Sequence, residues 1–207
     1  MRIPWLVPIV VLLCVVPGCS PRDFLTRRLA SDLIAGSDVF KNPQHFWLRT
    51  GIIPSKDYSS PEYLVLQRRG WITGVAAPCP PSGPATTHQQ GAPGCWDVSL
   101  TPLGVEAFRD LIPKNLVPMQ YFNVPIANRE LIAVTGISKA GNFADVEFQW
   151  KWVPTNEVGT ALNPGGVVYN SIVGFREYDD GWRVMRTVSA KNNQGLEEAL
   201  VNTDPPQ

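Results

Sequence analysis

The chain has 207 residues, of which 44% are hydrophobic and 17% are charged, and its 18 basic and 18 acidic side chains leave no net charge. That length is enough for one sizeable core or two small domains. The balanced charge does not favour binding to nucleic acid, and we predict no nucleic-acid partner.

The N-terminus has the pattern of a secretory signal. A basic start is followed by an uncharged apolar run at residues 3–16, which is shorter than the roughly 20 residues that a membrane-spanning helix needs. The run ends in Val-Pro-Gly-Cys-Ser at 16–20, and small residues before a cysteine at this place resemble the lipobox of bacterial lipoproteins. The resemblance implies that a signal peptide of residues 1–18 is removed and that Cys19 is lipidated at the start of a tether of residues 19–23. A plain secretory signal and an uncleaved anchor are the alternatives.

The same resemblance implies a location. A lipidated Cys19 would hold the protein at the bacterial cell envelope, with the lipid bilayer as its first partner. Ser20, rather than Asp, follows the cysteine, which in a diderm organism implies the outer membrane and exposure to the periplasm. We expect a second partner, an envelope protein.

Two further cysteines, Cys79 and Cys95, remain after Cys14 is assigned to the signal and Cys19 to the lipid. In an oxidising compartment two such cysteines most simply form a disulfide. It would close a loop with 15 residues between the cysteines (95 − 79 − 1), which stabilises by roughly 3 kcal/mol in the chain-entropy model. A metal or redox pair is the alternative, but neither cysteine has another close by and the chain has only two histidines. We therefore predict no metal site and no cofactor.

Residues 24–112 are expected to form one domain. Apolar residues at spacings of three and four predict a helix over 24–35, and Gly36 ends it. The segment 41–57 contains two prolines, and we expect it to be irregular apart from a short extended piece at 46–48. A second helix is predicted over 59–70, from a serine cap followed by proline to a basic end and glycine.

Two short strands, at 71–73 and 96–100, are predicted on either side of a loop at 78–94, and another helix begins at Thr101. This order resembles the wing half of winged-helix domains over about 59–111. The residues that carry the resemblance are Leu66, Gly70, Ile72, Leu100, Thr101 and Gly104. The resemblance implies a winged-helix-like shape used as a scaffold or protein contact. The sequence lacks an obvious basic recognition helix, so DNA binding is not carried over.

The second half is expected to be a sheet. A proline-rich linker at 113–125 leads into a β-sheet domain at 126–201, and 202–207 are expected to be a disordered tail. The strongest pattern is at 144–152, where polar and apolar residues alternate strictly, as on a strand with one buried face. Other strands are predicted at 131–137, 167–178 and 182–186.

The sequence Tyr-Asp-Asp-Gly-Trp-Arg-Val at 178–184 looks like the last hairpin of cystatin-like or NTF2-like sheets. Together with this hairpin, the strands predicted above make four antiparallel strands. The predicted fold is therefore α+β, with a winged-helix-like N-terminal half and a four-stranded antiparallel sheet packed on helix in the C-terminal half.

The sequence shows no pairing of a Ser or Cys nucleophile with a base, and we predict no catalytic residue. Asp145 and Glu147 share a strand face, about 7 Å apart by strand geometry, a separation that suits paired acid–base catalysis. A solvated sheet face is the commoner interpretation of such a pair. If a ligand or partner patch exists, we expect it on the concave side of the sheet, at Phe148, Trp150, Phe175 and Trp182.

The expected role is that of a non-enzymatic accessory, assembly or binding module held at a membrane through Cys19. Two alternatives remain open. One is an enzyme of unfamiliar design that uses the exposed carboxylates of the sheet. The other is a cytoplasmic winged-helix DNA-binding regulator whose N-terminus is not a signal.

Overall fold

The structure is a computed structural model, and it describes residues 24–80, 94–112, 121–186 and 195–201. The predicted signal peptide, the lipidated Cys19, the tether and the tail lie outside the described residues. So does the first part of the predicted linker.

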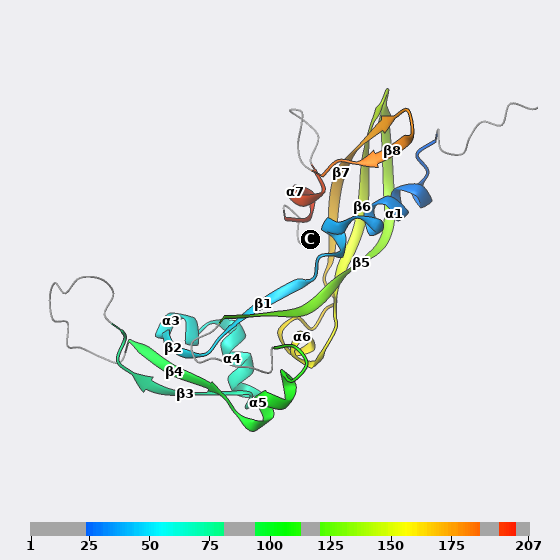
Figure 1. Cartoon of the computed structure of the whole chain (residues 1–207). Coiled ribbons are helices and arrows are strands. Elements are labelled where there is room, and N and C mark those ends of the chain that lie inside the picture. The colour runs from blue at the N-terminus through cyan, green and yellow to red at the C-terminus, as the bar shows by residue number, and fades with distance from the viewer. Residues whose placement is uncertain (1–23, 81–93, 113–120, 187–194, 202–207) are drawn as a thin grey trace, which may run out of the picture.

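Two antiparallel sheets form the framework. The larger has the order β1-β5-β6-β7-β8 and the smaller the order β2-β4-β3. Figure 1 shows them at opposite ends of an elongated molecule, joined where β1 pairs with the first part of β5. The strands are β1 (Gln44–Arg49), β2 (Gly51–Pro54), β3 (Ile72–Ala77), β4 (Cys95–Leu100), β5 (Tyr121–Ala140), β6 (Phe143–Pro154), β7 (Val168–Tyr178) and β8 (Gly181–Val184).

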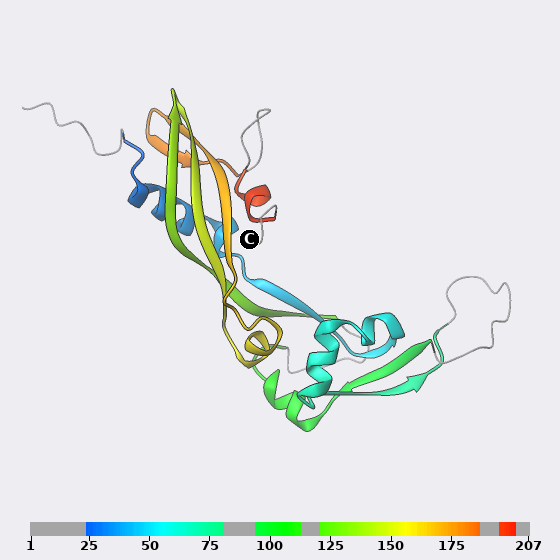
Figure 2. The ribbon, with the colours of Figure 1, turned by 180° about the vertical axis from the view of Figure 1, so that it is seen from behind.

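Seven helices among the described residues pack on these sheets. Figure 1 shows α1 in front of the strands of the large sheet, and Figure 2, from behind, shows the same strands in front of α1. A helix therefore covers one face of this sheet, as predicted. The helices are α1 (Arg27–Gly36), α2 (Asp38–Lys41), α3 (Ser55–Tyr58), α4 (Pro61–Arg68), α5 (Pro102–Ala107), α6 (Glu157–Leu162) and α7 (Leu196–Val201).

The core is divided into two clusters. The first fills the space between the large sheet and α1, α2 and α7, and Trp150 lies at its centre with its indole N–H donating to Ser171 over 3.0 Å. The second joins the small sheet to β1, α4 and α6, and includes Leu48, Phe108 and Val158. Strand β5 contributes to both clusters, with Val134 in the first and Phe122, Val124 and Ile126 in the second, so this one strand connects the two ends of the molecule.

The central strand is confirmed. In β6 the alternating residues Ala144, Val146, Phe148 and Trp150 are each at most 2% exposed, and Asp145 between them is exposed. The first helix is also confirmed. It begins after Thr26, whose hydroxyl accepts a hydrogen bond from a backbone N–H of the first turn.

The prediction of four strands in the large sheet is wrong, since the sheet has five. The additional strand, β1, comes from the segment that was expected to be irregular because of Pro43 and Pro54. Both prolines lie outside β1, so its backbone is free to pair. Residues 121–125, expected to be linker, are the first residues of β5 and pair with β1.

The coarse α+β class is confirmed. At the small end of the molecule the chain order is β2, two helices, the β3–β4 hairpin and α5. Gly104 in α5 is required by close contact, since a Cβ atom there would lie 1.9 Å from the backbone oxygen of Trp71.

Candidate functional site

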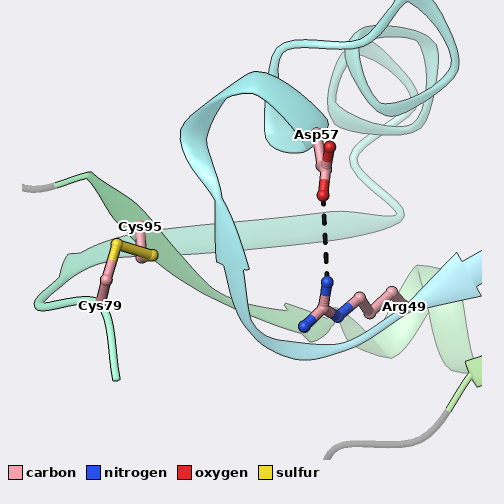
Figure 3. The surroundings of a disulfide bond; sticks show 4 residues. All are labelled: Arg49, Asp57, Cys79 and Cys95. Atoms are coloured by element: carbon pink, nitrogen blue, oxygen red, sulfur yellow. Dashed lines mark ion pairs between the residues drawn. A yellow bond between two sulfur atoms is a disulfide. The ribbon is translucent and has the colours of Figure 1, made fainter. Parts of the chain in front are cut away.

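The two predicted cysteines are joined. Cys79 and Cys95 form a disulfide with a Cα–Cα distance of 5.1 Å, at the end of the β3–β4 hairpin (Figure 3). The Cys95 side chain is buried, and Cys95 pairs with Pro54 of the neighbouring strand β2. The disulfide therefore fixes one end of the small sheet, which is a structural role.

The predicted ligand or partner patch is not a surface. Phe148, Trp150, Phe175 and Trp182 are at most 4% exposed and belong to the core cluster beneath α1, α2 and α7. The sequence indicated which face of the strands is apolar but not that three helices fill its concave side. This prediction is corrected: the four side chains hold the sheet to its helices.

The two carboxylates, Asp145 and Glu147, are exposed on the opposite face of β6. Their strand neighbours include Gly136 and Gly174, which have no side chains to form the wall of a site. Within the described ranges, no three His, Cys, Asp or Glu side chains are grouped as metal ligands. Both carboxylates are therefore on the solvent-exposed face of the sheet.

A cavity lies elsewhere, where β1 meets α3, α4 and the beginning of β5. Its volume is about 510 Å³. It is lined by His45, Phe46, Trp47, Arg49, Asp57, Ser60, Glu62, Tyr63 and Tyr121.

Arg49 supplies the cavity with a cation. Its guanidinium lies 3.9 Å from the carboxylate of Asp57 (Figure 3) and 5.0 Å from the centre of the Tyr121 ring. The Arg49 side chain is 32% exposed. Asp57 is the only ion-pair partner of this guanidinium among the described residues, so Arg49 and Asp57 offset each other's charge within the cavity.

Tyr63 ties α4 to the backbone of β1. Its hydroxyl accepts a hydrogen bond from the N–H of Arg49 over 2.8 Å and donates one to the C=O of the same residue over 2.9 Å. The ring packs on Phe46, and burial raises the pKa of the Tyr63 hydroxyl above its ordinary value. The phenol therefore stays neutral and occupies both main-chain groups of Arg49.

The rim of the cavity is aromatic and exposed. Trp47 and Tyr121 are each 60% exposed, on the same face of the paired strands β1 and β5. Trp47 lies opposite Asn123 and Arg49 lies opposite Tyr121, so the two aromatic residues are diagonal neighbours, about 7–8 Å apart. We call Trp47, Arg49 and Tyr121 the aromatic–arginine surface. Tryptophan, tyrosine and arginine are the residue types most enriched at the energetic centres of protein interfaces.

Sequence-based prediction gave a short extended piece at 46–48 but did not place Trp47 on a common surface with Arg49 and Tyr121, although the alternation of this segment is readable in the sequence. Residues 45–49 alternate as His-Phe-Trp-Leu-Arg, and in the structure Phe46 and Leu48 are buried while His45 and Trp47 are exposed. The two flanking prolines, Pro43 and Pro54, led to the prediction of an irregular segment despite this five-residue alternation. The pairing with β5 is long-range, and local pattern does not reveal it.

Comparisons with protein-family models, with curated proteins and with solved structures find no match for this chain. In the part of the chain that the structure describes, no helix is both long and apolar enough to cross a membrane.

Proposed function

We propose that the protein is a non-enzymatic accessory or assembly module of the bacterial cell envelope, held at a membrane through lipidated Cys19, that binds a protein partner through the aromatic–arginine surface. The observation that carries the proposal is the exposure of Trp47 and Tyr121 on either side of Arg49 at the rim of a cavity. Large exposed aromatic side chains that gather around a cavity and an arginine are typical of binding surfaces.

The exposed area of Trp47 and Tyr121 is large enough to contribute measurably to the binding of a partner. A tryptophan or tyrosine buries roughly 150–250 Å² when fully enclosed. Each residue is 60% exposed, so about 100 Å² can still be buried, which at about 25 cal/mol per Å² stabilises a complex by roughly 2–3 kcal/mol for each residue. Part of this is offset by the entropy that association costs.

The disulfide and the N-terminal pattern support the envelope. A Cys79–Cys95 disulfide is compatible with an oxidising compartment outside the cytoplasm, and it argues against a cytoplasmic DNA-binding regulator. Figure 1 shows the beginning of α1 at the large-sheet end of the molecule, and the small sheet at the other. An anchor that precedes α1 would hold the small sheet away from the bilayer.

A winged-helix-like shape for the N-terminal half forms part of the proposal. The strand, two helices and hairpin, with the sheet order β2-β4-β3, support it. The first strand of this unit follows directly on β1, so the shape would present one wall of the cavity to a protein partner rather than to DNA.

Co-purification from native membranes tests the proposal. The tagged full-length chain is extracted in mild detergent, and its bound proteins are compared with those of Trp47→Ala, Tyr121→Ala and the control Ile172→Ala. Ile172 is also exposed (49%), but on the outer face of β7. We expect a partner that is retained by the wild type and the control and lost with both aromatic variants. Equal retention by all four chains would rule out the aromatic–arginine surface as the binding site.

The anchor has a separate test. Cys19→Ala should move the protein from the membrane fraction to the soluble fraction, because acyl chains can no longer be attached. Wild-type protein that is extracted from membranes and carries no acyl mass at Cys19 would exclude the lipid anchor.

A further inference from the structure

Strand β1 is an edge of the large sheet. It pairs on one side with β5, and among the described residues no strand pairs with its other side. Figure 1 shows β1 lying outermost where the two ends of the molecule join. Unpaired main-chain groups on an edge strand are a template for another extended chain.

The bonds of Tyr63 show which residues face this edge. Because the Tyr63 hydroxyl holds both the N–H and the C=O of Arg49, these two groups point away from β5. Main-chain groups alternate along an antiparallel strand, and the register is regular from His45 to Arg49. The N–H and C=O groups of His45 and Trp47 therefore point to the same outer edge as those of Arg49.

Proline on the partner strand agrees with this assignment. Pro125 lies opposite His45. Because the main-chain groups of His45 point away from β5, His45 and Pro125 form a pair without mutual hydrogen bonds. The missing N–H of Pro125 therefore costs the pairing of β1 with β5 nothing. The pairing of β5 with β6 begins only at Ala127, beyond the proline.

The cavity lies along the same edge. Four of its lining residues come from β1, and Asp57, Ser60 and Glu62 face them from α3 and the beginning of α4. A segment paired with the main chain of His45 and Trp47 would place alternate side chains over the cavity. At Arg49 the hydroxyl of Tyr63 already occupies the edge, so the added strand would end there.

The charge of the cavity indicates which side chain it receives. Asp57, Glu62 and Arg49 together carry one net negative charge when His45 is neutral. Arg49 lies beside Asp57, whereas Glu62 is exposed and has no ion pair among the described residues. The exposed indole of Trp47 offers a face to a cation.

We propose that the partner binds by strand addition: an extended segment with a lysine or arginine pairs with the outer edge of β1 at His45 and Trp47 and places its basic side chain in the cavity near Glu62 and Trp47. This inference rests on the proposed function. It specifies the partner chemistry and the binding geometry at the same site.

Three blocked heptapeptides test the inference on the purified full-length chain. The first alternates valine and lysine, the second has glutamate in place of lysine, and the third is the lysine peptide with N-methyl groups on alternate amides. Binding is followed by titration calorimetry. Amide hydrogen exchange is measured residue by residue.

We expect the lysine peptide to slow exchange at the amides of His45 and Trp47, which face the free edge, with little change at Phe46 and Leu48, which already bond to β5. The glutamate and N-methyl peptides should each bind at least about tenfold more weakly, a difference of about 1.4 kcal/mol. Glu62→Gln should weaken the binding of the lysine peptide, whereas the matched control Glu197→Gln on α7 should leave its binding unchanged. Absence of binding by the lysine peptide at millimolar concentration, or equal binding of its N-methyl form, would overturn strand addition.

The two proposals fail separately. If a partner is lost with Trp47→Ala and Tyr121→Ala but the peptides give no edge protection, the partner binds the aromatic–arginine surface without adding a strand. If the partner is retained by Trp47→Ala and Tyr121→Ala and the peptides also give no edge protection, both proposals are wrong.

Discussion

Arg129 joins the second helix and its C-terminal cap to the large sheet. Its Nη1 donates to the backbone oxygens of Val39 over 3.1 Å and Asn42 over 2.9 Å. Its guanidinium lies 4.4 Å from the ring centre of Trp152 and 5.5 Å from that of Trp150. Burial lowers the pKa of the guanidinium from its ordinary value, and no carboxylate pairs with it among the described residues. In addition to the core packing, one partly buried cation thus ties α2 to β5.

We expect Arg129→Met to destabilise the protein by about 2–4 kcal/mol. Methionine keeps much of the apolar stem, but it removes two hydrogen bonds from a charged donor, roughly 1.5–3 kcal/mol each, and cation–π contacts of about 0.5–2 kcal/mol. The variant no longer bears the desolvation cost of a partly buried charge, which offsets several kcal/mol of this loss. In a chain of this size 1 kcal/mol corresponds to about 2–4 °C, so the melting temperature should fall by roughly 5–15 °C.

Thermal and urea unfolding monitored by circular dichroism measure the effect. Arg129→Lys should lose less, because an ammonium keeps the charge but cannot reproduce the planar contact with both rings. Arg176→Met is the matched control. Arg176 is also near aromatic rings but exposed, and its loss should change stability by less than about 0.5 kcal/mol. An Arg129→Met variant as stable as the wild type would show that the desolvation cost of the cation equals the free energy that its contacts contribute. That result would refute the reasoning.

Three further predictions concern glycine, the disulfide and tyrosine. Gly159→Ala would place a Cβ atom 1.9 Å from a backbone oxygen of β5 and should cost about 3 kcal/mol, whereas Gly36→Ala, with open space around it, should be neutral or stabilising in urea titrations. Reduction of the Cys79–Cys95 disulfide should lower the free energy of unfolding by about 3 kcal/mol, and an unchanged urea midpoint with dithiothreitol would contradict the chain-entropy estimate. The pKa of Tyr63 is raised by burial, so the stability that its neutral form contributes is complete below about pH 10 and is lost at higher pH. Tyr63→Phe should therefore show a smaller fall in urea midpoint between about pH 9 and pH 11 than the wild type, and equal falls would exclude this residue as the cause.

Local pattern predicted the parts of the fold that local chemistry determines. The alternation of β6, the capped helix α1 and the turn between β7 and β8 follow from residues that are neighbours in the chain, and each is confirmed. The disulfide was predicted because only two cysteines remained once the N-terminal pair was assigned.

The misses come from contacts between distant segments. Nothing near Trp47 indicates that its strand pairs with residues about 75 positions later, at 121–127. The same limit explains the incorrect patch. The apolar face of β6 could be predicted, but whether solvent, a partner or the protein's own helices covers it depends on packing, and Ala30 and Ile34 of α1 cover it.

Site-specific photo-crosslinking in native membranes tests the central claim most directly. The photoreactive p-benzoylphenylalanine is placed at Trp47 and, as the control, at Ile172, in the otherwise unchanged full-length chain. The account predicts one discrete crosslinked protein species from position 47, lost when Arg49→Ala is added, and no such species from position 172. Crosslinking from position 172 but not from position 47 would show that the partner binds another face, and would contradict the assignment of the aromatic–arginine surface.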